Sequence, residues 1–355
     1  MYTARDELTG KGLRFQTKQD ADAWLARERT RVLDGKWKPP AATPTTVMTL
    51  RRFAEIWIRR RDLEVRSAEH YEQLLRDHIN PVLGDVPLPA ITPTDVDAWY
   101  ANLDPKTPTA RAHAYGLLRT LMSDAANRDL IGKSPCRIRG AGLTKRARTI
   151  RPATLDELEA LVDAVPPRYE AMVLLAAWCA LRFGELTELR RSDVEIVELD
   201  GVKVGTLRIT RGVVRTKAGE KLIKDPKSAA GKRTVAIPPH LIPAIEDHLA
   251  AHAAPGRNAL LFPSRNDPGE HMTHSTLNKV WLRARAEVGR DDLAFHDLRH
   301  TGATLAAATG ATLAELMARL GHSTPVAAMR YQHAAADRDR VIADALSALA
   351  SANKK

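Results

Sequence analysis

Apolar residues between about 46 and 132 recur every three or four positions, which is the spacing that buries one face of a helix. In the first such stretch, Leu50 and Trp57 share a face, and Thr49 is placed to cap the helix. Short connections separate the stretches, so the pattern predicts a compact helical bundle. The later helices are expected to begin at Ser67, at Thr94 and near Thr109, and the last to end near Arg128.

The first 46 residues follow a different pattern. Alternation around Leu13 and Phe15 predicts a strand, and apolar spacing over 18–33 predicts a helix. The proline-rich stretch 38–44 would end that helix and act as a linker. We therefore expect a small separate unit before the bundle.

The region after residue 152 contains both the helical and the strand spacing of apolar residues. Thr154 and Glu157 form a capping box, and a second apolar helix is expected over 170–180. Alternating segments over 203–238 predict a small antiparallel sheet, and helices return after Pro239. The expected fold class is multidomain and mainly α, with a small antiparallel sheet in the last domain (α+β). The expected parts are a unit at 1–46, a bundle at 47–136, a linker at 137–151 and a larger domain at 152–355.

The charge of the chain indicates a class of partner. Lys and Arg number 54 against 43 Asp and Glu, which gives a formal net charge of +11. Such a chain attracts polyanions, of which nucleic acid is the commonest large one. The linker has six basic residues and no acidic one, so it is either a solvated connection or a strap along a phosphate backbone. Its basic residues are Arg137, Arg139, Lys145, Arg146, Arg148 and Arg151.

The composition argues against several other classes of protein. Cys136 and Cys179 are the two cysteines, too few for a disulfide framework or a cysteine zinc site, so reduced thiols in the cytoplasm are expected. The longest nearly apolar run, 171–181, is too short to cross a bilayer. Phosphate-binding glycine motifs are missing, and His248 and His252, with no third ligand nearby, are expected to face solvent. We expect neither a metal, nor a cofactor, nor a membrane partner.

Four segments of the last region carry candidate chemistry. Each alone has an ordinary explanation, such as a helix ion pair, a solvated lysine or a core tyrosine. Two arginines, two histidines and a lysine in one domain, all followed by a tyrosine, are not expected by chance. The segments are a turn with Arg182 and Glu185, a turn with Lys227 before a strand, the pentapeptide HDLRH with His296 and Arg299, and a Leu-Gly-His322 followed nine residues later by Tyr331.

This order and spacing resemble the tyrosine recombinase, or phage integrase, family. The family pattern is an arginine in an L-R-x-G-E turn, a β-hairpin lysine, an H-x-L-R-H box, and an L-G-H with a tyrosine nine positions on. The chain matches this pattern without a break. The resemblance implies that the bundle binds the core DNA site and that the last domain is catalytic. The first 46 residues resemble part of an arm-site-binding domain.

The resemblance also implies a reaction. Tyr331 would attack a DNA phosphate, giving a 3′-phosphotyrosyl bond and a free 5′ hydroxyl. Arg182 and Arg299 would bind the non-bridging oxygens and neutralise the charge that grows there. A free phenol has a pKa of about 10, so Tyr331 needs a proton acceptor. His296 resembles the family's general base, and Lys227 resembles its general acid at the 5′ oxygen.

Other motif residues are given supporting roles. His322 is expected to hydrogen-bond a phosphate oxygen or to orient Tyr331. Glu185 is expected to hold the arginine turn in shape. His300 and His333, next to the motif residues, are expected to have structural roles, with a direct catalytic role as the alternative. Because the phosphotyrosyl ester conserves bond energy, rejoining would need no ATP.

The implied partners are double-stranded DNA attachment sites and three further copies of the chain. In the family, four protomers act on two DNA partners and exchange strands through a Holliday junction. An excision factor or a host DNA-bending protein would be further partners. The tail, 337–350, either packs on its own domain or, as the family suggests, docks on a neighbouring protomer. Its apolar face comprises Val341, Ile342, Ala345, Leu346 and Leu349.

Three alternatives remain beside a phage or mobile-element integrase. The same chemistry serves Xer-like chromosome dimer resolution, although a resolvase would not need the first 46 residues. A type IB topoisomerase shares the tyrosine chemistry, but the bundle-plus-catalytic layout and the L-G-H spacing favour a recombinase. A DNA-binding protein with a decayed site is disfavoured because every expected catalytic residue is present.

Overall fold

The computed structural model describes residues 2–5, 12–15, 17–34, 48–144 and 149–332, and a few positions between 343 and 351. The chain divides into two compact units, Met1–Lys145 and Arg146–Lys355. The first unit opens with an antiparallel pair of strands, β1 (Tyr2–Arg5) and β2 (Gly12–Phe15), and with helix α1 (Lys18–Leu33), which packs against both strands. The strand expected around Leu13 and the helix expected over 18–33 are confirmed.

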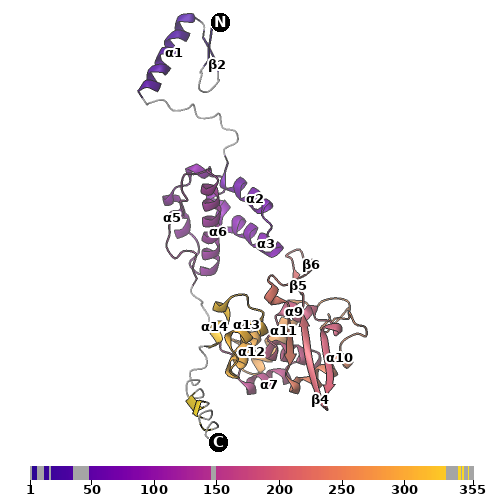
Figure 1. Cartoon of the computed structure of the whole chain (residues 1–355). Helices are drawn as coiled ribbons and strands as arrows, with labels where there is room; N and C mark the ends of the chain where they lie inside the picture. The colour runs from indigo at the N-terminus through magenta and orange to yellow at the C-terminus, as the bar shows by residue number, and fades with distance from the viewer. Residues whose placement is uncertain are drawn as a thin grey trace. The chain divides into compact units, whose positions relative to one another are not determined.

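The helical bundle of the first unit follows (Figure 1). Its buried core contains Phe53, Trp57, Trp99 and Leu118. The predicted cap is confirmed, because the Thr49 hydroxyl accepts a hydrogen bond from the backbone N–H of Arg52. The elements are α2 (Leu50–Arg60), α3 (Val65–Leu74), a π-helical turn η1 (Leu75–Ile79), α4 (Asn80–Leu83), η2 (Leu88–Ala90), α5 (Pro93–Ala101) and α6 (Pro108–Asn127).

Two of the predicted helix starts are displaced, and a third, near Thr109, is confirmed. Helix α3 begins at Val65 rather than at Ser67. Helix α5 begins at Pro93, and its cap is Thr92, which exchanges hydrogen bonds with Asp95 in a capping box. Helix α6 begins at Pro108, one residue before the predicted start. Two of these starts share a cause: proline fits the first turn of a helix, because its missing N–H would have no partner there.

The second unit combines helices with two small sheets. Strands β3 (Val194–Leu199), β4 (Val202–Ile209) and β7 (Arg233–Ile237) form an antiparallel sheet in the order β3-β4-β7. Strands β5 (Gly212–Arg215) and β6 (Lys221–Lys224) form a separate hairpin. The predicted sheet is therefore present, but it starts nine residues earlier than expected, at β3. The multidomain, mainly α fold class is confirmed.

The helices of the second unit surround this sheet. The capping box of Thr154 and Glu157 is confirmed at the start of α7. The apolar helix expected over 170–180 starts earlier and ends two residues sooner, as α8. The helices and short turns are α7 (Leu155–Asp163), α8 (Pro167–Trp178), α9 (Phe183–Glu188), η3 (Arg191–Asp193), η4 (Ala229–Gly231), η5 (Pro239–Leu241), α10 (Ile242–Ala251), α11 (His274–Glu287), α12 (Asp297–Ala308), α13 (Leu313–Leu320) and α14 (Pro325–Gln332).

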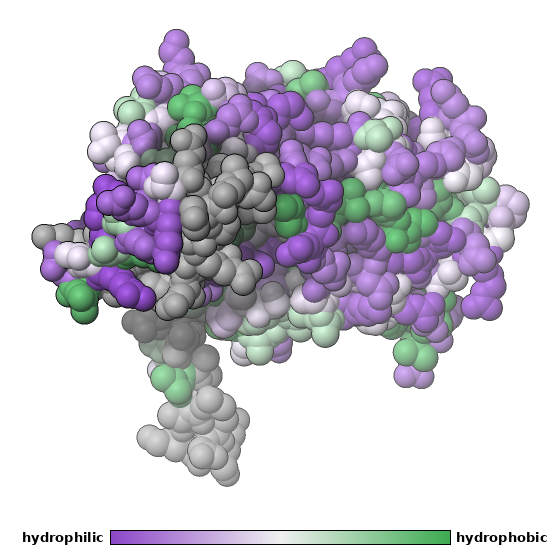
Figure 2. Space-filling view, turned by 90° about the horizontal axis from the view of Figure 1, so that it is seen from above, coloured by the Kyte–Doolittle hydropathy of each residue, from purple (hydrophilic) through white to green (hydrophobic). Residues whose placement is uncertain are grey.

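Polar side chains cover most of the face shown in Figure 2, and hydrophobic residues form small patches between them. Within the described residues, no helix is both long enough and apolar enough to cross a membrane. Most of the predicted apolar face of the tail lies outside the described residues, and the described Leu346 is exposed.

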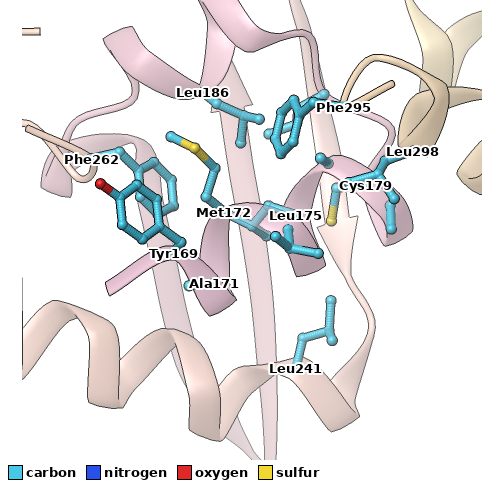
Figure 3. Close-up of a cluster of buried hydrophobic side chains, with 14 of the residues drawn as sticks. Tyr169, Ala171, Met172, Leu175, Cys179, Leu186, Leu241, Phe262, Phe295 and Leu298 are labelled. Carbon is cyan, nitrogen blue, oxygen red and sulfur yellow. The ribbon is translucent and has the colours of Figure 1, made fainter. Parts of the chain in front are cut away.

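Helix α8 forms the centre of the second hydrophobic core. Met172, Leu175 and Cys179 are buried among residues of other elements, including Leu186 and Leu298 (Figure 3). Burial raises the pKa of the Cys179 thiol to about 12, so the thiol stays protonated, as a core residue would.

Helix α12 crosses α8 at very close range. A Cβ atom added at Gly302 would lie 1.9 Å from the carbonyl oxygen of Ala177, so only glycine allows this approach. The crossing brings the start of α12 beside the turn that follows α8, where the predicted site residues lie.

The prediction that His248 faces solvent is wrong. Its ring is buried, and its Nε2 atom is 2.8 Å from the carbonyl oxygen of Leu261. Burial is the main reason that its pKa falls to about 4. The helix α10 turns this histidine toward the core, which spacing from His252 alone does not reveal.

Candidate active site

The site is built on the turn between α8 and α9. Ala180 adopts a left-handed backbone conformation, with φ 54°, and Arg182 then caps α9. The Glu185 carboxylate accepts hydrogen bonds from the Arg182 backbone N–H, at 2.9 Å, and from Arg182 Nη1, at 2.7 Å. The carboxylate therefore holds both the backbone and the side chain of the arginine.

A third residue, Arg233, completes this cluster and was not among the predicted site residues. Its Nη1 and Nη2 atoms donate to the two carboxylate oxygens of Glu185, at 3.1 and 3.0 Å, and its Nε donates to the carbonyl of Arg319. Arg233 is the first residue of β7, on the same face as the buried Val235 and Ile237. This period-two spacing was the sequence signal that its side chain points inward.

Burial and ion pairing oppose each other at Glu185. Burial raises the pKa of the carboxyl, but the hydrogen bonds and charge of Arg233, with help from Arg182, outweigh this effect and lower the pKa to about 2. Glu185 is therefore ionised at every pH at which the protein works.

Arg299 lies at the start of α12 and is 4% exposed. Its two terminal nitrogens donate to the carbonyl oxygens of Ala180 and Leu320, at the ends of α8 and α13. Among the described residues no carboxylate is hydrogen-bonded to this guanidinium group. Burial, followed by the charge of Arg182, lowers its pKa to about 9, which still leaves it positive at neutral pH.

Two histidines lie close to these arginines. His322 follows Gly321, whose left-handed conformation, with φ 63°, ends α13. Burial and then the charges of Arg299 and Arg182 lower the pKa of His322 to about 4, so it is neutral at pH 7. His296, at the start of α12, is exposed over part of its surface, and the protein around the rest of the ring lowers its pKa, which the charge of Arg299 lowers further.

Tyr331 lies on α14 and is 8% exposed. A hydrogen bond of 2.6 Å joins its hydroxyl to Nδ1 of His300. The charge of Tyr331 also affects Arg299, so the phenol lies within electrostatic range of that guanidinium group. The cluster around the tyrosine is small and apolar, and comprises Ala180, Ala303, Ala307, Leu316, Leu320 and Ala328.

A pocket of about 570 Å³ opens beside the arginine turn, and Arg182, Lys227 and His322 are among its lining residues. Lys227 is exposed, in the loop between β6 and β7. Because β6 pairs with β5 and β7 pairs with β4, this loop joins two different sheets and is not a hairpin turn. The expectation of a hairpin position for Lys227 is therefore wrong, although the loop does lead into the strand that starts at Arg233.

The structure describes three of the six predicted DNA-binding residues. Arg137 and Arg139 are exposed and have no ion-pair partner among the described residues. The side chain of Arg151 pairs with Glu157 at 2.8 Å, so part of its charge is already neutralised. Lys145, Arg146, Arg148 and His333 lie outside the described residues.

The chemistry of the site is that of an anion-binding centre. Arg182, Arg233 and Arg299 interact electrostatically around a single carboxylate, Glu185, which leaves an excess of positive charge. No three metal-ligating side chains cluster anywhere in the described part of the chain. Paired guanidinium groups beside a tyrosine hydroxyl suit an enzyme that transfers a phosphoryl group to a phenol.

Comparisons with known proteins agree with this class. The model of the phage integrase family matches residues 152–338, and that of the phage integrase N-terminal SAM-like domain matches residues 49–103. A prophage phiRv2 integrase of Mycobacterium tuberculosis is 51% identical to the chain, over 95% of the chain and 88% of the relative. The chain therefore belongs to the phage integrase family, whose members are site-specific recombinases that act on DNA.

Solved structures show the same fold at lower sequence identity. A Tn1549 transposon integrase, in complex with a circular intermediate DNA, is 20% identical, with a TM-score of 0.67 over 83% of this chain and 99% of the other. A lambda integrase tetramer bound to a Holliday junction is 19% identical, with a TM-score of 0.55 over 91% of this chain and 93% of the other.

Proposed function

We propose that this integrase joins the DNA of a phage or related mobile element to a host genome, with Tyr331 as its nucleophile. One observation carries the assignment of the residues. Arg182, Arg299, His322 and Tyr331 come from four separate segments of the chain, yet the other three all lie within electrostatic range of the buried guanidinium group of Arg299.

In the proposed reaction, the Tyr331 oxygen attacks a DNA phosphorus and the bond from phosphorus to the 5′ oxygen breaks. Arg182 lines the pocket and binds a non-bridging oxygen, while the buried Arg299 supplies a second guanidinium group. One well-placed arginine in phosphoryl transfer is worth about 10³–10⁵ in rate. Lys227, exposed in its loop, gives a proton to the leaving 5′ oxygen. The family resemblance assigns the phenolic proton to His296, and the neutral His322 hydrogen-bonds the phosphate.

The buried position of Tyr331 adds a requirement. Because the side chain is 8% exposed, a phosphate reaches its oxygen only after α14 shifts enough to uncover the phenol, which stays beside α12. We propose that DNA binding causes this shift. In the protein without DNA, Tyr331 is then shielded from phosphate groups other than that of the target site.

The proposed domain roles follow the predicted boundaries. Residues 47–136 bind the core site, 1–46 bind arm sites, and the basic linker 137–151 follows the backbone between 47–136 and the catalytic domain, 152–355. The active assembly is a homotetramer on two double-stranded attachment sites in the host cytoplasm, with an excision factor or a DNA-bending protein as further partners. The lambda integrase tetramer on a Holliday junction, which shares the fold, supports the proposed assembly.

The test is covalent trapping on a suicide substrate. Tyr331→Phe is expected to shift attachment-site DNA in a gel as wild type does but to form no protein–DNA adduct, because phenylalanine lacks the attacking oxygen. Tyr169→Phe is the matched control: Tyr169 is also buried, but it lies in the core of α8, and the variant should keep its adduct.

Three outcomes would contradict the proposal. An adduct formed by Tyr331→Phe would place the nucleophile elsewhere. Relaxation of a plasmid without attachment sites, and without recombinants, would indicate a topoisomerase. Resolution of chromosome dimers without integration of attachment sites would indicate a resolvase.

A further inference from the structure

The HDLRH box has two histidines, and the structure distinguishes them. His296 lies at the N-terminus of α12 and is exposed, whereas His300 lies one turn further along the helix and is partly buried. The His300 ring lies 5.7 Å from the Tyr331 ring and 5.7 Å from the His296 ring, centroid to centroid. The hydrogen bond between the Tyr331 hydroxyl and His300 Nδ1 is 2.6 Å long.

We propose that His300 is a catalytic residue, which holds the Tyr331 hydroxyl and accepts its proton as the oxygen attacks the phosphate. This inference rests on the proposed function of Tyr331. It moves the general base one turn along α12 from the position that the family resemblance implies, His296.

The proton balance of the step is complete. In the proposed step, His300 starts in its neutral form with the proton on Nε2, so that its Nδ1 lone pair accepts the hydrogen bond from the phenol. As the bond from the Tyr331 oxygen to phosphorus forms, the phenolic proton passes to Nδ1. The bond from phosphorus to the 5′ oxygen breaks, and that oxygen takes a proton from Lys227. Rejoining runs the same transfers in reverse, so no other reactant is consumed.

The surroundings of the phenol explain why a direct acceptor is needed. Tyr331 is packed among alanine and leucine side chains, and a bare phenolate is costly in such a place. A proton acceptor already within hydrogen-bond distance avoids a separate ionisation step. The positive charge of Arg299, which is coupled to Tyr331, stabilises the negative charge that grows on the oxygen.

The titratable and charged groups around His300 come from each neighbouring element. His296 and Arg299 share α12 with it, and Tyr331 lies on α14. His322, in the turn after α13, is coupled to His300, and Arg182, in the turn after α8, is coupled to Arg299.

The experiment compares histidine variants in single-turnover adduct formation on a suicide substrate, from pH 5 to pH 9. His300→Asn keeps a hydrogen-bond acceptor near the position of Nδ1 but cannot take a proton. We expect it to lower the rate by about 10²–10⁴-fold and to abolish the acidic limb of the pH profile. His240→Asn, at an exposed histidine outside the pocket, is the control and should keep the wild-type profile.

A second arm distinguishes proton transfer from simple positioning. Replacing Tyr331 with a fluorinated tyrosine, whose phenol is more acidic, reduces the need for a base. The replacement should therefore accelerate His300→Asn much more than it accelerates the wild type. A purely structural role for His300 would give no such selective rescue.

Failure of the inference about His300 and failure of the proposed function give different results. If His300→Asn keeps the wild-type rate and pH profile, or if His296→Asn alone shows the loss and the rescue, the inference is overturned while the proposed function stands. If wild type forms no adduct, the proposed function itself fails. Should His300→Asn lose its gel shift, ¹⁵N chemical shifts of His300 in the intact protein decide: an unprotonated Nδ1 supports the inference, and a protonated Nδ1 overturns it.

Discussion

At the scale of single residues, Glu185 determines the shape of the site. It is the carboxylate that both Arg182 and Arg233 contact, and it lies on α9, between the turn after α8 and the strand β7. Removing one partner from a buried ion pair costs about 3–5 kcal/mol, because the remaining charge is left without compensation. Glu185 therefore contributes to stability as well as to the placement of Arg182.

The pH dependence of stability tests this role. The pKa of Glu185 in the folded protein, about 2, lies below its ordinary value of 4.5, so its ionised form stabilises the fold. This contribution is complete above about pH 4.5 and is lost as the pH falls toward 2. Glu185→Gln is expected to be less stable than wild type at pH 7 and to lose less of its stability between pH 4.5 and pH 2.

Thermal unfolding at several pH values gives the measurement. Glu159→Gln, at an exposed carboxylate on α7, is the control and should leave the acid-induced loss unchanged. Parallel acid profiles for Glu185→Gln and wild type would show that Glu185 is not held as an ion.

The candidate site was predictable residue by residue only in part. The motif spacing identified both arginines and the tyrosine, since these follow a fixed order along the chain. It did not identify Arg233, because a single arginine at the start of a strand has no motif of its own. Nor did it show which histidine meets the phenol, since His296 and His300 differ only in their position along α12.

At the scale of elements, the crossing of α8 and α12 positions Arg299. The close approach at Gly302 lets α12 lie against the backbone of α8, and Arg299 lies one turn before that point. From there its guanidinium group reaches the carbonyl oxygens of Ala180 and Leu320 and so connects the ends of α8 and α13. A wider spacing between the helices would separate these groups.

Gly302→Ala tests the importance of this crossing. The added methyl group would overlap the carbonyl of Ala177, and such overpacking typically costs about 1–3 kcal/mol. We expect a lower midpoint for unfolding of the second unit and slower adduct formation, because Arg299 moves with α12. Urea unfolding and the trapping assay measure the two effects.

Gly116→Ala is the matched control. Gly116 also lies inside a helix, α6, but a Cβ there meets nothing within 4 Å. The substitution should stabilise the bundle by about 0.4–1 kcal/mol, because alanine restricts the unfolded chain. Equal effects of the two substitutions would contradict the proposed role of the α8–α12 crossing.

The elements themselves were largely predictable from local pattern. Helix faces and capping residues recur at fixed spacing, so Thr49 and Thr154 marked their helices correctly. Strand β3 was missed because its apolar alternation breaks where Ile196 and Val197 follow each other, and because Val197 and Leu199 are exposed at the edge of the sheet.

At the scale of the whole molecule, the two units have separate hydrophobic cores, and the chain as a whole carries more positive than negative charges. The formal net charge of +11 predicts DNA binding that weakens steeply with salt, because each neutralised phosphate releases counterions. Arg137 and Arg139, exposed at the end of the first unit, are candidates for two such contacts.

The double variant Arg137→Ala, Arg139→Ala tests the proposed strap. If both residues contact phosphates, the slope of log K against log salt should decrease in magnitude by about 2. The double variant Arg76→Ala, Lys203→Ala removes the same charge from residues already paired with Asp77 and Glu246. Fluorescence anisotropy over a salt series measures both slopes, and equal slopes would show that the linker arginines act only through net charge.

The sequence by itself determined the class of this protein and the order of most of its elements, and it named the candidate site residues. Helical periods, caps and motif spacing are local properties, and they survive in a linear chain. The tertiary structure alone decided that Arg233 neutralises Glu185, that Lys227 lies between two sheets, and that His300 rather than His296 meets the Tyr331 hydroxyl. These contacts depend on how helices and strands distant in sequence pack together, and the local spacing of residues does not specify such contacts.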